Sequence, residues 1–503
     1  MEENYVKLYD ITKPFSEDRI PLYFQGDFKR ENEKIYVDAG KTLDLGTYFN
    51  AFSLKKWMDY TNISSLKIEL NLNGKFSVEI FGADITGEEK ISTYETDGDF
   101  SHSFSFDEMD VLTAKFDMIF VKLNAKENGE FLDGAYYGEF SALNDIHIGI
   151  TICTFKREKY LLPNLEKLAT LTAKNPNYSV MVVDNGNTLE EKDADELKIL
   201  HNPNYGGSGG FTRGIMEQIN AKKATHILLT DDDVMLELSV FDRLYAYLRG
   251  LKSEHSEKFF AGAMLSIEKP TMQTENTGLW NKINGKSFGK GFILTDRKTL
   301  CANEYPTKGD NAFAGWWFCA VPVKAVEKIG YPLPIFIKGD DIEYGARNDK
   351  EILTLNGVSV WHETFQSKLS PAIQYFGDRN MLLMIHLMKN VGRGEFLLAV
   401  AARIVRWLNE GSYEGVRMLE YALKDLSGGF EKITEIPADK KFAEVRAYSL
   451  DKNLLASVFS TLTMGFKYFL DYNAKDKKIK AFVKEKLQDQ KFWRNYLQLD
   501  GGR

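Results

Sequence analysis

Three short, almost entirely apolar runs alternate with helix-like stretches in the middle of this chain, and this alternation constrains its fold most. The runs are "IHIGITICTF", "YSVMVVDNG" and "THILLTDDD". Between them lie "REKYLLPNLEKLATLTAK" and "GGFTRGIMEQINAKK", whose apolar residues recur at helical spacing. Strands that are apolar on both faces are typical of a parallel sheet covered by helices. The pattern therefore predicts an α/β domain with a doubly wound parallel sheet.

Each apolar run ends in polar residues, which read "TFKR", "DNG" and "TDDD" in chain order. The carboxyl ends of parallel strands meet at one edge of the sheet, and ligands of such sheets bind at that edge. The shared placement indicates a ligand site more strongly than any one of these motifs does.

The residues on either side of the predicted α/β domain follow different sequence patterns. Residues 1–145 alternate apolar and polar residues in short strands, which predicts a β-sandwich of jelly-roll type. The dipeptide Asn73-Gly74 inside "SSLKIELNLNGKFSVEIFGADI" predicts a hairpin. This domain is either a packing module or a glycan-binding sandwich. Residues 371–503 carry helical spacing, so the predicted domains are 1–145, 146–370 and 371–503.

Charge and cysteine usage exclude several classes of protein. The net charge of −8 gives no broad basic surface, so no nucleic-acid partner is expected. Three scattered cysteines without a CxxC motif indicate neither a zinc site nor a disulfide framework, and they suit a reducing compartment. The N-terminus lacks an apolar signal segment and no run reaches ~18 apolar residues, so we expect a cytoplasmic protein without a spanning helix.

A basic stretch lies near the C-terminus. Residues 475–494 carry eight Lys or Arg against three acids in a helical pattern. This stretch is either a solvated helix face or a peripheral contact with the anionic inner face of the plasma membrane.

The aspartates of "TDDDV" are the first candidate for chemistry. Asp231 and Asp233 flank Asp232 at the end of an apolar strand, and alternate strand residues point the same way. Two converging carboxylates suit a hard divalent cation such as Mg²⁺ or Mn²⁺. The alternative is a solvated acidic turn, but the apolar strand and the motifs below favour a metal site.

Two loops add candidates for anion binding and for a base. "NPNYGGSGGFTRG" places four glycines before a helical pattern, which lets backbone approach an anion at a helix N-terminus; the alternative is a flexible turn. "FIKGDDIEYGAR" crowds Asp340, Asp341 and Glu343. Crowded carboxylates raise one another's pKa and can supply a general base; the alternative is a helix-capping cluster.

"WHE" and "GWWF" complete the set. His362 follows another strand-like run, "GVSVW", where a neutral imidazole could complete a metal shell. Trp316 and Trp317 would face opposite sides of an extended segment, so that one packs in the core and the other meets a sugar; the alternative is that both are core. Together these pieces predict metal-dependent transfer from a nucleotide diphosphate, in which a carboxylate deprotonates an acceptor hydroxyl.

At this point the sequence resembles the inverting family-2 glycosyltransferases of GT-A fold, and most closely the polymerising galactofuranosyltransferases of mycobacteria and their bacterial relatives. The resemblance rests on "TFKR", "VVDNG", "NPNYGGSGGFTRG", "TDDDV", "GWWF", "FIKGDDIEYGAR" and "WHE", and on "LGTYFNAFSLKKW" at residues 45–57. It implies an N-terminal β-sandwich, a GT-A catalytic domain and a helical C-terminal region, which is the order already predicted.

The resemblance implies a role for each matching position. It implies that Asp341 is the catalytic base and that Asp231, Asp233 and His362 hold Mn²⁺ or Mg²⁺. It implies nucleotide-sugar contacts from Thr154, Arg157, Asp184, Asn204, Gly206, Gly207 and Asp232. It implies acceptor contacts from Trp316, Trp317, Asp340 and Glu275. Gly339 departs from the family, which has a tryptophan there, so the acceptor and the linkage stay open.

The implied reaction is a single in-line displacement that moves galactofuranose from UDP-galactofuranose to a hydroxyl of a lipid-linked cell-surface glycan, with inversion. The resemblance also implies a homo-oligomer. The same fold with another donor, such as dTDP-rhamnose, is an alternative. A nucleotidyltransferase would carry glycines soon after the first strand, and "TICTFKREKY" has none. A non-catalytic glycan-binding protein is disfavoured by the intact set of Asp231, Asp233, Asp341 and His362.

Overall fold

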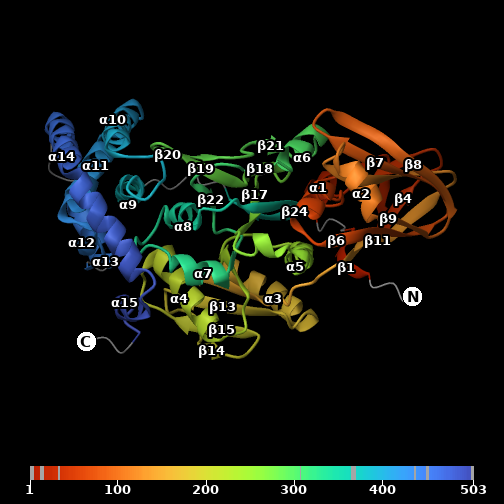
Figure 1. Ribbon diagram of the computed structural model, residues 1–503, viewed down its shortest axis with the longest axis horizontal. Coiled ribbons are helices and arrows are strands. Elements are labelled where there is room, and N and C mark those ends of the chain that lie inside the picture. The colour runs from red at the N-terminus through yellow and green to blue at the C-terminus, as the bar shows by residue number, and fades with distance from the viewer. Residues whose placement is uncertain are drawn as a thin grey trace.

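The chain forms three parts in a row. The computed structural model describes residues 5–11, 16–31, 34–305, 307–363, 370–435, 438–448 and 453–499. Figure 1 shows a β-sandwich at one end, a mixed sheet with helices in the middle, and a helical region at the other end. This is the predicted order of a sandwich, an α/β domain and a helical region.

The first part is a sandwich of two antiparallel sheets. One sheet consists of β3 (Lys29–Glu31), β4 (Lys34–Val37), β11 (Gly129–Phe140), β6 (Ile63–Asn73) and β9 (Phe100–Ser105), with β1 (Val6–Asp10) on β11. The other consists of β2 (Gln25–Gly26), β5 (Thr42–Asp44), β10 (Met118–Ala125), β7 (Lys75–Asp84) and β8 (Gly87–Asp97). A 3₁₀ turn (Glu17–Leu22) and two short helices, α1 (Leu54–Tyr60) and α2 (Phe106–Thr113), complete it.

The predicted hairpin at Asn73-Gly74 is wrong. β6 and β7 lie in different sheets, so the turn carries the chain from one sheet to the other. Both strands bury alternate apolar residues, Leu66 and Leu70 on β6 and Val78 on β7 among them, and both bury them in the same core. The apolar alternation that predicts two strands is therefore satisfied across the sandwich core, without pairing between the two strands.

The second part is built on a ten-stranded sheet. Its order is β14 (Lys192–Asp193), β15 (Leu197–His201), β13 (Tyr178–Asp184), β12 (Ile148–Thr154), β16 (His226–Asp231), β23 (Cys319–Pro322), β17 (Phe260–Ser266), β18 (Met272–Glu275) and β21 (Phe292–Ile293), with β24 (Leu353–His362) on β17. The helices around it are α3 (Glu158–Lys174), α4 (Gly206–Asn220), α5 (Ser239–Gly250), α6 (Arg297–Asn303), α7 (Val323–Ile329) and α8 (Asp340–Asn348). A small sheet, β20 (Asn284–Ser287), β19 (Thr277–Asn281) and β22 (Ala312–Ala314), lies beside it.

The three predicted strands are β12, β13 and β16, and they run parallel. Thr154 pairs with Asp184, and Cys153 pairs with Asp231. The polar ends of the three strands therefore lie at one edge of the sheet, as the sequence predicts. The sheet is not parallel throughout, because β23 runs antiparallel to both β16 and β17.

The segment "LGTYFNAFSLKKW" joins the sandwich to the strand β24. Lys56 donates to the Thr354 hydroxyl over 2.9 Å, and the Tyr48 hydroxyl lies 3.4 Å from the Val358 carbonyl oxygen. Thr354 and Val358 both belong to β24, whose last residue is His362. The sandwich therefore braces a strand that carries a predicted metal ligand.

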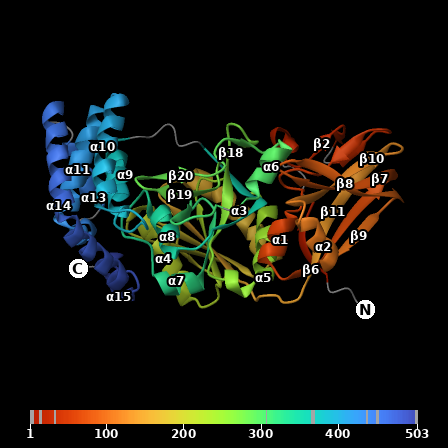
Figure 2. The ribbon, with the colours of Figure 1, turned by 45° about the horizontal axis from the view of Figure 1, so that its top comes forward.

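The third part is helical and consists of α9 (Pro371–Met384), α10 (Arg393–Asn409), α11 (Tyr413–Gly428), α12 (Phe430–Glu435), α13 (Ala438–Tyr448), α14 (Leu454–Lys486) and α15 (Gln490–Tyr496). Figure 2 shows these helices gathered at the end opposite the sandwich, with α14 on their outer side. Over the described part of the chain, no helix combines the length and the apolar character that crossing a bilayer requires.

Candidate functional site

Three predicted metal ligands meet where β16 and β24 end. Asp231, Asp233 and His362 each offer one ligand atom, and these atoms lie within 4.8 Å of one another. The Oδ1 atom of Asp233 lies 3.0 Å from Nε2 of His362. Asp231 closes β16 and His362 closes β24, so two strands of one sheet deliver the group from separate parts of the sequence.

The imidazole of His362 is oriented for metal binding. Its Nδ1 lies 2.5 Å from the carbonyl oxygen of Glu363, and an N–H donated there leaves the Nε2 lone pair directed at the carboxylates. Burial alone would lower the pKa of His362, but the hydrogen bond to Asp233 raises it above its ordinary value.

Burial and mutual repulsion also shift the pKa values of the three aspartates 231–233. Burial, followed by the charge of Asp233, raises the pKa of Asp231 to about 7, and burial raises that of Asp232 to about 6. Burial would raise the pKa of Asp233 too, but the hydrogen bond to His362 and the charge of Arg157 hold it below the ordinary value. A divalent cation would relieve this repulsion, because it favours all three ionised carboxylates.

The residue types of this group fit a divalent cation. Carboxylates suit Mg²⁺ and Mn²⁺, whereas an imidazole suits transition ions, so the set of two carboxylates and one imidazole favours Mn²⁺ over Mg²⁺. Arg157 now pairs with Asp233 and lies 3.8 Å from Asp232. Thr154, at the end of β12, donates to Asp232 over 2.7 Å. The predicted nucleotide contacts Thr154, Arg157 and Asp232 thus lie beside the three predicted metal ligands.

The predicted base lies at the start of α8. Asp340 and Asp341 are its first two residues, and Gly339 precedes them with a φ of +91°. Burial first, and then the charge of Asp341, raises the pKa of Asp340; burial also raises the pKa of Asp341. Asp341 acts electrostatically on Asp231, so the two carboxylate clusters share one site. Glu343, the third acid of this motif, pairs with Arg347 one turn along the helix at 2.8 Å.

A strained loop sets the position of Asp340 and Asp341, and the sequence prediction missed its anchor. Phe336 and Lys338 have positive φ angles of 75° and 69°. The buried side-chain amide of Asn380, on α9, lies 3.2, 2.7 and 2.9 Å from the carbonyl oxygens of Ile335, Ile337 and Lys338. The helix α9 therefore anchors the loop that precedes α8 through these hydrogen bonds. The only sequence signal is the buried polar run "GDRN" within an apolar helix.

The glycine-rich helix α4 lies against the same loop. Gly206 has a φ of +68°, and a Cβ there would lie 2.2 Å from the carbonyl oxygen of Phe336. A Cβ on Gly207 would lie 3.6 Å from the Asp340 carboxylate, and Asn204 accepts the backbone N–H of Gly206 at 3.1 Å. At position 206 only a glycine allows this approach, which brings the N-terminus of α4 next to Asp340.

The carboxylate of Asp184 is fully buried and engaged with its own loop. It accepts backbone N–H groups from Gly186, Thr188 and Leu189 at 2.6–2.8 Å. Asp184 therefore shapes the loop that follows β13, and its predicted contact with the uracil stays a prediction.

The predicted acceptor residues divide into buried and accessible ones. Trp316 and Trp317 are 5% and 6% exposed and pack into different cores, Trp316 against Phe211 and Trp317 with its indole N–H on the Gly262 carbonyl. Neither indole presents an open ring face, so a direct sugar contact by either stays a prediction. Glu275 is partly exposed at the end of β18 and acts electrostatically on Asp341.

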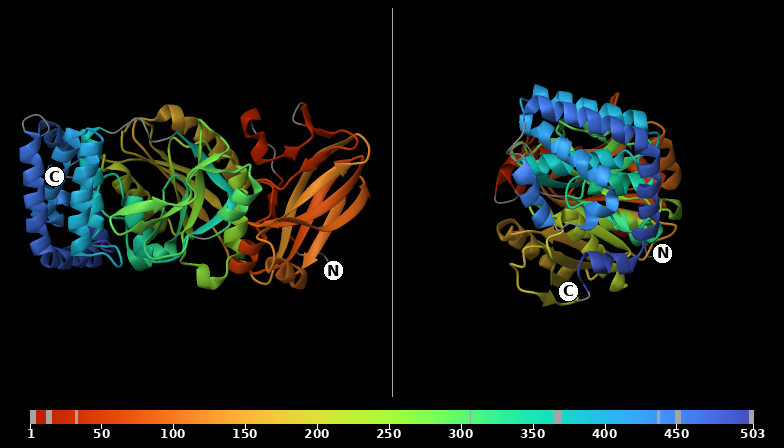
Figure 3. Two further views of the ribbon diagram at one scale, coloured as in Figure 1. Left: turned by 90° about the horizontal axis from the view of Figure 1, so that it is seen from above. Right: turned by 90° about the vertical axis from the view of Figure 1, so that its left-hand side faces the viewer.

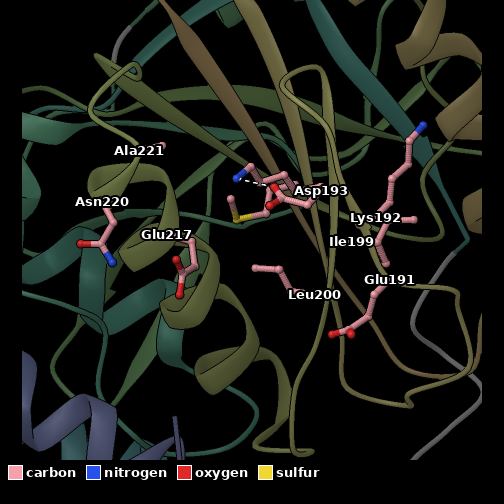
Figure 4. Close-up of a pocket in the computed structure, with 10 residues that line it drawn as sticks. Glu191, Lys192, Asp193, Ile199, Leu200, Glu217, Asn220 and Ala221 are labelled. Atoms are coloured by element: carbon pink, nitrogen blue, oxygen red, sulfur yellow. Dashed lines mark ion pairs between the residues drawn. The ribbon is translucent and has the colours of Figure 1, made fainter. Parts of the chain in front are cut away.

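A pocket of about 540 Å³ lies away from this site. Figure 4 shows its lining of β14, β15 and α4 residues, in which Asp193 and Lys198 form an ion pair of 2.6 Å. Both acidic side chains and lysines line this pocket. None of the predicted site residues is among its lining residues.

Two family models match this chain. Residues 146–374 match the model described as "Glycosyltransferase like family 2", and residues 25–137 match the model described as "Galactofuranosyltransferase 2 N-terminal". The chain therefore carries a family-2 glycosyltransferase domain behind a galactofuranosyltransferase-type N-terminal domain.

Curated relatives agree with these matches. The chain is 26% identical over 428 residues to galactofuranosyltransferase GlfT2 of Mycolicibacterium smegmatis, covering 78% of this chain and 65% of that protein. It is 23% identical over 454 residues to galactofuranosyltransferase GlfT2 of Mycobacterium tuberculosis, covering 80% of this chain and 68% of that protein. The chain thus spans about two thirds of the length of these relatives.

Solved structures are more distant. S. aureus TarS 1-349 aligns at 12% identity with a TM-score of 0.37, covering 64% of this chain and 91% of that one. The family models and the curated relatives confirm the predicted resemblance, and with the α/β sheet they confirm the predicted fold class.

Proposed function

We propose that this chain is an inverting, metal-dependent glycosyltransferase that moves galactofuranose from UDP-galactofuranose to a hydroxyl of a lipid-linked glycan. The observation that carries the proposal is the meeting of Asp231, Asp233 and His362 beside the paired carboxylates of α8. The similarity to galactofuranosyltransferases supports the choice of donor.

The bound Mn²⁺ or Mg²⁺ would neutralise the diphosphate of the leaving UDP. Asp231, Asp233 and His362 would hold it, and Arg157 would turn from Asp233 toward the diphosphate. The loop glycines and the N-terminus of α4 favour an anion at the same place.

In this mechanism Asp341 accepts the proton of the acceptor hydroxyl as the new bond to the anomeric carbon forms. Its raised pKa makes it a better base than an ordinary aspartate. Asp340, whose pKa is raised further by burial and by the Asp341 charge, would keep its proton and donate a hydrogen bond to the acceptor. Since the chain contributes position and charge, no covalent enzyme intermediate is expected.

The first experiment is donor hydrolysis without an acceptor, in Mn²⁺ or Mg²⁺. UDP-galactofuranose, UDP-galactopyranose, UDP-glucose and dTDP-rhamnose would be compared side by side. Metal-dependent release of UDP from the furanose alone is the expected result. Release from dTDP-rhamnose instead would keep the mechanism and replace the donor. Because hydrolysis without an acceptor can be slow, donor binding is also measured by calorimetry. Absence of binding to all four donors would overturn the proposal.

Three further parts of the proposal concern surroundings and assembly. We propose that the acceptor is carried on a lipid, that the chain works at the inner face of the plasma membrane, and that it forms a homo-oligomer. Analytical ultracentrifugation of the purified chain tests the last of these.

A further inference from the structure

The N-terminal half of α14 has one buried face and, opposite to it, one apolar face that is exposed. One face packs against α10 and α11 and consists of Ser457, Thr461, Gly465, Tyr468 and Tyr472. The opposite face, which we call the outer stripe, consists of Leu455, Phe459, Leu462, Phe466 and Leu470. Successive members of the outer stripe are three or four residues apart, so they line up along one side of the helix.

The outer stripe is open to solvent. Its side chains are 44–77% exposed, with Leu455 and Phe459 the most exposed of the five. Figures 1 and 3 place α14 at the end of the molecule farthest from the sandwich. Five aligned large apolar side chains on one exposed helix face mark a surface that meets another apolar phase.

Lysines continue the same side of the helix. Lys477, Lys480 and Lys484 follow the outer stripe at helical spacing, and all three are exposed. Asp476 lies at the margin of this face and pairs with Lys480 at 2.9 Å. One helix of 33 residues, about 50 Å long, thus presents an apolar half and a cationic half in one line.

We propose that this side of α14 lies on an anionic lipid bilayer, with the outer stripe in the boundary between headgroups and acyl chains and the lysines against lipid phosphates. Apolar and basic residues on one helix face are the combination that interfacial helices use. A second copy of the chain would have to supply acids opposite the lysines, and the same face of α14 supplies only Asp476, already paired. The choice of a lipid surface also rests on the proposed function, whose acceptor is carried on a lipid.

The test is sedimentation of the full chain with vesicles. One set contains phosphatidylcholine alone, and the other contains equal parts of phosphatidylcholine and phosphatidylglycerol. The wild-type chain is expected to bind the anionic set and to be released by added salt. Phe459→Ser combined with Phe466→Ser should weaken binding at least about tenfold. Lys477→Gln combined with Lys484→Gln should weaken binding about tenfold to anionic vesicles alone. Lys480 is left intact because it pairs with Asp476.

Matched controls lie on the sandwich, at the other end of the molecule. Phe106→Ser combined with Val111→Ser removes exposed apolar side chains, and Lys75→Gln combined with Lys126→Gln removes two exposed charges. Both control variants should bind vesicles as the wild-type chain does. Circular dichroism melting shows whether each variant is folded.

Two results would overturn the proposal. One is a wild-type chain that does not sediment with anionic vesicles, or α14 variants that bind as well as the wild type. The other is a dimer in solution whose mass halves in the Phe459/Phe466 variant, since a second copy would then cover the stripe. Donor hydrolysis measured without vesicles should be unchanged in all α14 variants, so failure of the proposed reaction is distinguishable from failure of membrane binding.

Discussion

Replacing Asn380 by Ala should slow turnover without weakening the binding of UDP or metal. Two hydrogens of this amide serve the carbonyl oxygens of Ile337 and Lys338 at 2.7 and 2.9 Å, and both bonds are lost in the variant. A buried carbonyl that loses its partner costs about 1–3 kcal/mol, so two cost about 2–4 kcal/mol after partial rehydration.

The backbone strain of the loop before α8 is similar in free energy to these lost hydrogen bonds. Phe336 and Lys338 are left-handed residues with side chains, at about 1–2 kcal/mol each. Without the amide, relaxed conformations of the loop compete with the one that positions Asp341. At 1.36 kcal/mol per tenfold, a loss of about 2–4 kcal/mol corresponds to a fall in kcat of about 30- to 1,000-fold. Arg379 still holds the Ile335 carbonyl at 2.8 Å, which keeps the effect toward the lower end.

The assay is single-turnover transfer or hydrolysis at saturating donor, with Mn²⁺ and UDP affinities measured by calorimetry. Asn50→Ala is the matched control: this buried amide donates to the Tyr23 carbonyl at 2.7 Å inside the sandwich, so its loss should lower the melting temperature and leave kcat unchanged. The reasoning is refuted if Asn380→Ala keeps kcat within about threefold of wild type, or loses UDP affinity in proportion to kcat.

The remaining predictions concern charges. Asp341→Asn should abolish turnover and leave UDP binding nearly intact; retained turnover would exclude Asp341 as the base. Because burial raises the pKa of Asp341 and a base must be ionised, turnover of the wild type should fall with falling pH along a limb above the ordinary aspartate value of about 3.9, and a limb at or below that value would contradict this. Arg157→Gln should bind Mn²⁺ a few-fold more tightly without nucleotide, because the guanidinium that competes for Asp233 is gone, and it should bind UDP more weakly. If calorimetry shows the affinities for Mn²⁺ and UDP both rising or both falling, Arg157 does not turn from Asp233 to the diphosphate. Lys56→Met should cost about 3–5 kcal/mol in urea unfolding because it strands the buried Glu304 carboxylate 3.5 Å away, and Lys56→Met with Glu304→Gln should recover much of that loss.

The sequence predicted the parts of the site that follow from strand periodicity. Parallel strands share an edge, so "TFKR" and "TDDD" had to meet once β12 and β16 were identified, and the registers of Cys153 and Asp231 agree. The strand-like run "GVSVW" made His362 a candidate metal ligand, but only the family resemblance joined it to Asp231 and Asp233, because more than a hundred residues separate it from them.

The sequence could not predict long-range polar contacts or which strands pair with each other. The polar run "GDRN" sets Asn380 apart within an apolar helix, but it does not identify its partners, which are the backbone of a loop forty-odd residues earlier. Likewise, apolar alternation at Asn73-Gly74 predicts two strands but not whether they pair with each other or face each other across a core. Helical spacing over residues 371–503 likewise predicts helices without saying which face of α14 packs against α10 and α11.

The brace between the sandwich and β24 bears on how such a chain can be altered. Tyr48 contacts β24 four residues before its end at His362 and Lys56 contacts it near its start, so the sandwich and the strand that carries the predicted metal ligand share a polar interface. The N-terminal part therefore cannot be exchanged as a cassette to change what the enzyme recognises, and a truncation that removes it would also loosen the strand end that presents the imidazole. Grafting a new acceptor specificity onto this scaffold is better aimed at the loop before α8, for which the described residues show no backbone hydrogen bond to the sandwich.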